Sequence, residues 1–232
     1  MRCIHLSIPL LALCLAACGS DVAEAERNVA EQGGNEQVAD IAVDGEEVRI
    51  LAFGNSLFAG YNLAENEGYP ERLEQALRKD GVNARVIDAG VSGDTSAAGR
   101  QRLGFVLDRQ ADKPDLVLLE LGGNDLLRGI EPTDTRANFV AMLDELQMRG
   151  IPVLLMGMRA PPNYGPEYQG DFDAIYGDLA RKYDVALVPF WLESIYQSPE
   201  LFQDDRIHPT AEGIDALVAD TIDDVQAALA DG

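Results

Sequence analysis

Five short apolar segments alternate with longer segments of helical periodicity, and this order constrains the fold of the chain more than any other feature. The apolar segments are residues 48–53, 85–89, 116–121, 153–158 and 186–189. They lack alternating polar residues, which predicts strands that are covered on both faces. Helices are expected over residues 70–79, 96–108, 134–149, 171–182 and about 210–229. Strands and helices that alternate in this way predict an α/β fold with a parallel sheet and helices on both of its faces.

The first 18 residues have the composition of a secretory signal peptide, with one basic residue, a short apolar core and small residues at the end. The core is too short for a transmembrane helix. Its last four residues, Leu15-Ala16-Ala17-Cys18, resemble the bacterial lipobox, whose cysteine receives a lipid and becomes the first mature residue. We therefore expect lipidation of Cys18; the alternative is an ordinary signal peptide cleaved near Ala17. Because Gly19-Ser20 lacks the aspartate that retains some lipoproteins at an inner membrane, the sequence favours the outer membrane.

Residues 19–46 are rich in Ala, Glu, Asp, Gln and Gly and poor in large apolar residues. We expect them to form a polar tether that leads to a single domain over residues 47–232. The chain has a formal net charge of −22 at pH 7, and such acidity repels nucleic acids and anionic lipid head groups. Attachment to a membrane is therefore expected to come from the lipid, and nucleic acids are excluded as partners.

All three cysteines, Cys3, Cys14 and Cys18, lie in the expected signal peptide. The folded domain therefore has no thiol nucleophile, no disulfide and no cysteine-ligated metal site. Of the two histidines, only His208 lies outside the signal peptide. If the protein performs acid–base chemistry with an imidazole near neutral pH, the residue is His208.

Three candidate site residues, Ser56, Gly93 and Asn124, each follow an expected strand by a few positions. Because parallel α/β sheets bind ligands beyond the carboxyl ends of their strands, we expect these residues on one rim of the sheet. Each has a plainer interpretation: Ser56 as a turn residue or helix cap, Gly93 as a tight turn, and Asn124 as a helix cap. The functional interpretation is a nucleophilic hydroxyl with two N–H donors for an oxyanion.

Asp205 precedes His208 by three residues, a spacing that brings both side chains to one side of a loop or first helical turn. Alone, such a pair is often a capping arrangement. With Ser56 and Asn124 it supplies a hydroxyl, an amide donor and an Asp/His pair, which are the parts of a serine hydrolase.

The blocks FGNSLFAGY, GVSGDTS, LGGND and DRIHP, in this order and at these spacings, resemble the SGNH (GDSL) hydrolase superfamily. Within it, the chain is similar to the bacterial arylesterase/thioesterase/lysophospholipase group, in a lipoprotein form. The resemblance extends over residues 48–228. It implies a three-layer α/β/α sandwich of the flavodoxin-like kind, with a parallel five-stranded sheet in the order 2-1-3-4-5.

The same resemblance implies roles for the candidate residues. Ser56 would be the nucleophile, His208 the general base, and Asp205 the group that orients the imidazole. The oxyanion hole would consist of the backbone N–H of Ser56, the backbone N–H of Gly93 and the side-chain amide of Asn124.

Residues 160–165 resemble a substrate-side loop of that group, with Pro161, Pro162, Asn163 and Tyr164 as candidate contacts. We expect this loop to select the acyl chain. One position departs from the family pattern, because Asn55 stands where the family name calls for Asp. That position is not one of the three reacting groups, so no loss of activity is inferred. The departure questions any role of a carboxylate there in stiffening the serine loop.

The sequence therefore predicts a lipid-anchored serine esterase on the periplasmic face of a bacterial cell envelope, acting as a monomer without metal or cofactor. Its expected substrates are small acyl esters, acyl thioesters or lysolipids, which are cleaved through an acyl-enzyme intermediate. One alternative is an O-deacetylase of envelope polysaccharide. Another is a non-catalytic lipoprotein that uses the fold as a binding module, and the intact set of site residues argues against it.

Overall fold

The computed structural model describes residues 41–230, which belong to one compact unit. The expected signal peptide, Cys18 and most of the expected tether lie outside the described residues. Residues 41–46, the end of the expected tether, belong to this unit and are hydrogen-bonded to the rest of it. Arg78 Nε donates to the Ile41 carbonyl at 2.8 Å, and Asn83 Nδ2 donates to the Gly45 carbonyl at 2.9 Å.

The sheet has five parallel strands in the order β2-β1-β3-β4-β5, which confirms the predicted topology. The strands are β1 (Val48–Gly54), β2 (Ala84–Gly90), β3 (Leu116–Leu119), β4 (Val153–Met156) and β5 (Ala186–Val188). β3 and β4 are buried throughout, as predicted, whereas the edge strand β2 exposes Arg85 because solvent reaches the margin of the sheet. β3 and β4 end two residues earlier than predicted, because the chain leaves the sheet there to form the loops of the carboxyl-terminal edge.

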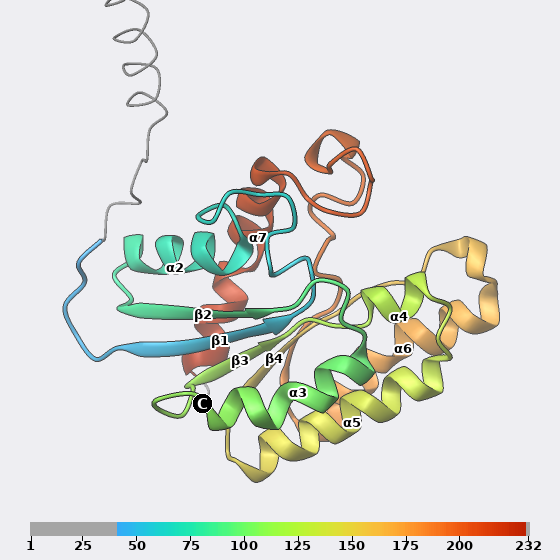
Figure 1. The fold of residues 1–232 in the computed structure, drawn as a ribbon, viewed down its shortest axis with the longest axis horizontal. Helices are drawn as coiled ribbons and strands as arrows, with labels where there is room; N and C mark the ends of the chain where they lie inside the picture. The colour runs from blue at the N-terminus through green and yellow to red at the C-terminus, as the bar shows by residue number, and fades with distance from the viewer. Residues whose placement is uncertain (1–40, 231–232) are drawn as a thin grey trace, which may run out of the picture. The chain divides into compact units, whose positions relative to one another are not determined.

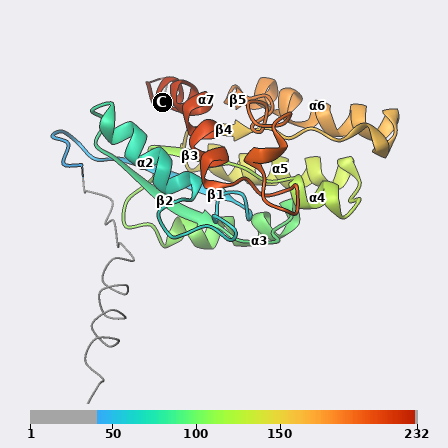
Figure 2. The same cartoon turned by 90° about the horizontal axis from the view of Figure 1, so that it is seen from above.

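Helices α2 (Tyr69–Lys79) and α7 (Ala211–Ala230) cover one face of the sheet, and α3 (Ser96–Asp108), α5 (Pro132–Met148) and α6 (Pro166–Tyr183) cover the other (Figure 1). Seen from above, α2 lies at the β2 end of the sheet and α6 at the β5 end (Figure 2). This is the predicted three-layer α/β/α arrangement. No helix among residues 41–230 is long and apolar enough to span a bilayer.

Two helices begin more than one residue earlier than predicted. α5 begins at Pro132 and not at residue 134, and α6 begins at Pro166 and not at residue 171. Proline suits the first turn of a helix, because its missing N–H has no partner there and its φ is already helical. The short helix α4 (Gly123–Leu127) and the 3₁₀ turns η1 (Pro162–Tyr164) and η2 (Pro199–Leu201) are absent from the sequence prediction, because such short elements have no periodicity to detect.

Candidate active site

The candidate residues converge at the carboxyl-terminal edge of the sheet. Ser56 follows β1, Gly93 follows β2, and Asn124 lies in the first turn of α4, shortly after β3. His208 lies in the loop before α7. All four line one cavity of about 550 Å³. The parallel sheet thus brings together residues that are separated by as many as 152 positions in the chain.

Ser56, His208 and Asp205 form a continuous hydrogen-bonded chain. Ser56 Oγ lies 2.8 Å from His208 Nε2, and His208 Nδ1 lies 2.6 Å from Asp205 Oδ2. An ionised carboxylate can only accept, so Nδ1 carries the ring proton and Nε2 presents its lone pair to the Ser56 hydroxyl. This is the geometry that general-base activation of a serine requires.

The surroundings of Asp205 keep its carboxyl group ionised. Its second oxygen, Oδ1, accepts the N–H groups of Ile207 at 2.9 Å and of His208 at 3.0 Å. Partial burial acts to raise the pKa of Asp205, but these bonds and the bond from the imidazole outweigh it and lower the pKa to about 2. Arg206, between Asp205 and Ile207, has a left-handed backbone conformation with φ of 60°. This strained conformation lets the loop turn back toward the Asp205 carboxylate.

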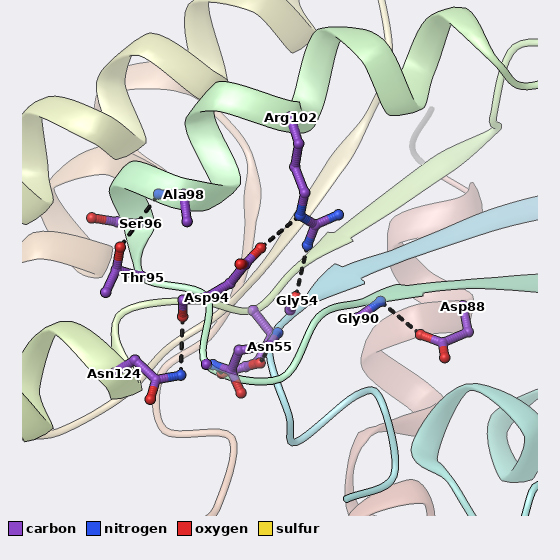
Figure 3. Close-up of polar contacts among 12 residues, drawn as sticks. Gly54, Asn55, Asp88, Gly90, Asp94, Thr95, Ser96, Ala98, Arg102 and Asn124 are labelled. Atoms are coloured by element: carbon purple, nitrogen blue, oxygen red, sulfur yellow. Dashed lines mark hydrogen bonds and ion pairs between the residues drawn. The ribbon is translucent and has the colours of Figure 1, made fainter.

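The loop after β2 brings Gly93 to the cavity. Its φ of 87° is a conformation that favours glycine. Arg102 of α3 joins this loop to the end of β1, because Nε donates to the Asp94 carboxylate at 2.6 Å and Nη2 donates to the Gly54 carbonyl at 2.9 Å (Figure 3). The same guanidinium lies 3.9 Å from the centre of the Phe53 ring. One side chain therefore holds the Gly93 loop against the strand that leads to Ser56.

The side chain of Asn124 is turned toward the same loop. Its Nδ2 donates to the Asp94 carbonyl at 3.0 Å, which uses one of the two N–H groups of the amide (Figure 3). The neighbouring Asp125 is fully buried and holds α4 in place. Asp125 Oδ2 accepts the Ser96 N–H at 2.7 Å, and Oδ1 accepts the hydroxyls of Ser96 and Thr135. These bonds join α4 to the first turns of α3 and α5.

The cavity has mainly apolar walls. Besides the residues above, its lining includes Leu57, Tyr61, Leu126, Leu127, Met158, Phe190, Leu192, Tyr196, Pro199, Phe202 and Ile207. Its volume lies within the range typical of small-molecule sites. Walls of this kind favour an acyl chain or an aromatic group over a sugar, because apolar surface is removed from water on binding.

The predicted substrate-side residues divide into two groups. Pro161 lines the cavity, whereas Pro162, Asn163 and Tyr164 form η1 and are not among the lining residues. The Tyr164 hydroxyl instead donates to the Leu126 carbonyl at 2.8 Å. The loop therefore reaches the cavity through Pro161 and contacts α4 through Tyr164.

Some residues of the site are missed by the sequence analysis. The Tyr61 ring lies against His208, with 4.4 Å between the ring centroids. Gln203 Nε2 donates to the carbonyls of Tyr61 at 2.8 Å and Pro209 at 2.9 Å, which joins the serine loop to the histidine loop. Tyr61 belongs to the FGNSLFAGY block and so carries a sequence signal. Gln203 and the cavity residues of segment 190–202 carry none, because only tertiary contacts bring them to the site.

The assembled groups suit nucleophilic acyl transfer. They comprise a hydroxyl, an imidazole, a carboxylate and N–H donors around one apolar cavity. Within residues 41–230, no group of three or more His, Cys, Asp or Glu side chains is arranged to hold a metal ion.

Comparisons with known proteins agree with this chemistry. Residues 52–216 match the family model described as the GDSL-like Lipase/Acylhydrolase family. The chain is 41% identical to an arylesterase of Vibrio mimicus over 164 residues, which are 71% of this chain and 81% of the relative. It is 39% identical to thioesterase 1/protease 1/lysophospholipase L1 of Escherichia coli K12 over 163 residues, 70% of this chain and 76% of the relative. The crystal structure of AlinE4, described as an SGNH-hydrolase family esterase, is 60% identical with a TM-score of 0.69, covering 80% of this chain and 98% of that one.

Proposed function

The chain belongs to the GDSL-like lipase/acylhydrolase family of carboxylic ester hydrolases, and we propose that it cleaves acyl esters with Ser56 as nucleophile and His208 and Asp205 as its proton relay. The observation that carries this proposal is the unbroken hydrogen-bonded chain from Ser56 Oγ through the imidazole to the Asp205 carboxylate. A serine hydroxyl that is only a turn residue or a helix cap has no need of such an arrangement.

The first half of the reaction forms an acyl-enzyme. His208 Nε2 takes the Ser56 proton as Oγ attacks the ester carbonyl, and Asp205 stabilises the resulting imidazolium. The oxyanion is stabilised by the backbone N–H groups of Ser56 and Gly93 and by the Asn124 amide. His208 then gives its proton to the departing alkoxide, and the acyl group stays on Ser56.

The second half releases the acid. A water molecule enters, His208 Nε2 accepts its proton, and the water oxygen attacks the acyl carbonyl. The tetrahedral intermediate occupies the same oxyanion hole, and its collapse returns the proton to Ser56 Oγ. The base and the acid of both halves are the same imidazole, so one histidine suffices.

We propose substrates with an apolar acyl or aryl group next to a carboxylic ester or thioester. The apolar walls of the cavity support this choice, and so do the names arylesterase, thioesterase and lysophospholipase among the relatives. A lysolipid fits the same description, because its long acyl chain is apolar and is joined through a carboxylic ester.

The decisive test is covalent labelling. A serine-directed phosphonate is expected to add one label per chain, on the peptide that contains Ser56, and to abolish hydrolysis of p-nitrophenyl butyrate. Ser56→Ala is expected to lose both the label and the activity, while circular dichroism shows the same fold. Full hydrolysis by Ser56→Ala would contradict the mechanism, and no hydrolysis by the wild type on any ester or thioester would favour a binding module.

For the N-terminal part we propose a lipid anchor at Cys18, on the strength of the lipobox-like Leu15-Ala16-Ala17-Cys18. Cys18→Ser is expected to abolish incorporation of radiolabelled palmitate in the bacterium and to release the protein from the membrane fraction. Its esterase activity is expected to stay, because Ser56 and His208 lie on the folded domain. Unchanged incorporation in Cys18→Ser would reject the anchor and leave the esterase proposal intact.

A further inference from the structure

A fully buried carboxylate lies directly beneath the serine loop. Glu120 follows β3, and none of its surface is exposed. Asn55, the residue before the proposed nucleophile, is 1% exposed and lies next to it. The proposed mechanism uses neither residue. A buried charge is costly unless it is hydrogen-bonded, so this pair requires an explanation.

Both carboxylate oxygens of Glu120 accept hydrogen bonds from the same residue, Asn55. Asn55 Nδ2 donates to Oε1 at 2.9 Å, and the Asn55 backbone N–H donates to Oε2 at 3.2 Å. The carboxylate can approach this closely because residue 54 is glycine: a Cβ at Gly54 would lie 2.9 Å from Glu120 Oε2. The end of β1 is therefore shaped around this carboxylate.

The other side of the Asn55 amide faces the nucleophile. Its Oδ1 accepts the Leu57 N–H at 2.9 Å and lies 3.4 Å from Ser56 Oγ. The amide thus donates toward Glu120 and accepts from the serine loop. An aspartate at this position could accept from the loop, but its side chain would have no donor for Glu120 Oε1 unless one carboxyl group held a proton, and only the backbone N–H to Oε2 would remain.

We propose that Glu120 is a positioning residue for the nucleophile, which it holds in place through the donor and acceptor sides of the Asn55 amide. The proposal rests on the assignment of Ser56 as the nucleophile. It explains how the chain works with Asn55 where the family name calls for Asp: the amide supplies a permanent N–H, so the contact with Glu120 does not need a shared proton.

The electrostatics of the pair agree with this geometry. Burial raises the pKa of Glu120 to about 7, although both hydrogen bonds from Asn55 act to lower it. Tyr176 of α6 is a titratable side chain that interacts electrostatically with Glu120, and its hydroxyl donates to the Leu121 carbonyl. A second carboxylate at position 55 would add a like charge in this buried place, and the pair would then keep one proton between them.

Three variants test the proposal by changing donors and acceptors at nearly constant volume. Asn55→Asp removes the side-chain donor Nδ2 but keeps the backbone N–H. The kcat/KM of this variant relative to wild type is expected to fall as pH rises, because the carboxyl groups of residues 55 and 120 then lose the proton that they share. Glu120→Gln places an amide N–H opposite one of the two Asn55 donors, so that one hydrogen bond is lost. The kcat of this variant is expected to fall on the order of 10- to 100-fold with little change in KM. Dividing each rate by the wild-type rate at the same pH removes the titration of His208 from the comparison.

The double variant Asn55→Asp/Glu120→Gln exchanges donor and acceptor. The introduced glutamine amide can then donate to the introduced aspartate carboxylate and accept the backbone N–H of residue 55, and the pair keeps its single negative charge. We expect kcat to recover to within about threefold of wild type, with a pH profile parallel to it. The rate at which a phosphonate labels Ser56 should follow the same order, because it reports the reactivity of the hydroxyl without a substrate in the cavity.

A stability effect alone would give a different pattern. Thr221→Val is the matched control, because it removes a buried hydroxyl that lies 2.7 Å from the Tyr69 hydroxyl, on the α2–α7 side. It is expected to lower Tm without changing kcat. Additive losses in the double variant, or losses of kcat that track Tm across all four variants, would overturn the positioning role. A wild type that phosphonate does not label would instead reject Ser56 as the nucleophile, so the two failures are distinguishable.

Discussion

His208 Nε2 lies 2.8 Å from Ser56 Oγ, although 152 positions separate the two residues in the chain. His208 lies in the loop before α7, and Ser56 lies in the loop that follows β1. Gln203 connects the two loops through the carbonyls of Tyr61 and Pro209. The distance between the proposed nucleophile and its proposed base is therefore set by the packing of two loops, and substitutions that move either loop are expected to change kcat.

Asp205→Asn is expected to lower kcat on the order of 10²- to 10⁴-fold, because an amide can present the wrong hydrogen-bonding group to His208 Nδ1 and stabilises the imidazolium less. KM for a short ester should change little.

Because the pKa of Asp205 is lowered to about 2, its carboxylate stays ionised through the working pH range and adds no step to the pH–rate profile there. Its stabilising contribution is present above pH 3.8 and is lost as pH falls toward 2. Steady-state kinetics and acid unfolding test these expectations, and an unchanged kcat would remove Asp205 from the relay.

Asn124→Ala is expected to lower kcat by about 10²- to 10³-fold with a smaller effect on KM, because an oxyanion donor acts in the transition state. Asn83→Ala is the control: its side chain donates to the Gly45 carbonyl, and this variant is expected to keep the wild-type kcat. A change confined to KM would make Asn124 a substrate-binding residue.

The acid limb of the pH–rate profile is expected to involve two groups. The sequence predicts that protonation of His208 alone causes the loss of activity at low pH, because protonated Nε2 has no lone pair to accept the Ser56 proton. The proposed positioning role adds Glu120 as a second group, because burial raises the pKa of its carboxyl group to about 7. In Glu120→Gln the limb should therefore fit a single titrating group, whereas the wild-type limb should need two. A limb that needs two groups in both proteins would exclude Glu120 as the second.

The same carboxyl group should shape the stability of the protein. Between pH 4.5 and about 7, the unfolded chain has lost the Glu120 proton while the folded chain keeps it. The free energy of unfolding is therefore expected to fall through this window as pH rises, and to level off above it. Urea unfolding at several pH values measures the slope. The slope should be smaller in Glu120→Gln, and equal slopes in the two proteins would contradict the assignment.

Chain-length selectivity is expected to depend on the segment after β5 as well as on the loop that begins at Ala160. Tyr196 lines the cavity and packs edge-on against Phe190, with 5.1 Å between the ring centroids. Tyr196→Ala should lower the octanoate-to-acetate ratio of kcat/KM by roughly 3- to 10-fold, because a long acyl chain loses apolar contact that acetate never makes. The double variant Pro161→Gly/Pro162→Gly should change this ratio less than Tyr196→Ala does, because only Pro161 of the two prolines lines the cavity. A larger change in the double proline variant than in Tyr196→Ala would assign chain-length selectivity to the loop that begins at Ala160.

Local signals in the sequence predict most of the fold. Nearly continuous apolar runs identify all five strands, and helical periodicity identifies the five long helices within a few residues. The starts of α5 and α6 are wrong by two and five residues, because Pro132 and Pro166 begin helices before the periodic pattern becomes visible. The topology follows from connection rules and from the resemblance of four sequence blocks to a known superfamily.

The sequence by itself determined which groups are available for chemistry. It contains one histidine outside the expected signal peptide, and it places Ser56, Gly93 and Asn124 just after strands that had to share a rim. The tertiary structure decided what surrounds them. Glu120 looks in the sequence like the end of a buried strand, and its contact with Asn55 spans 65 positions. Such contacts leave no periodic trace, because they depend on how β1 and β3 lie side by side and not on the residues next to them in the chain.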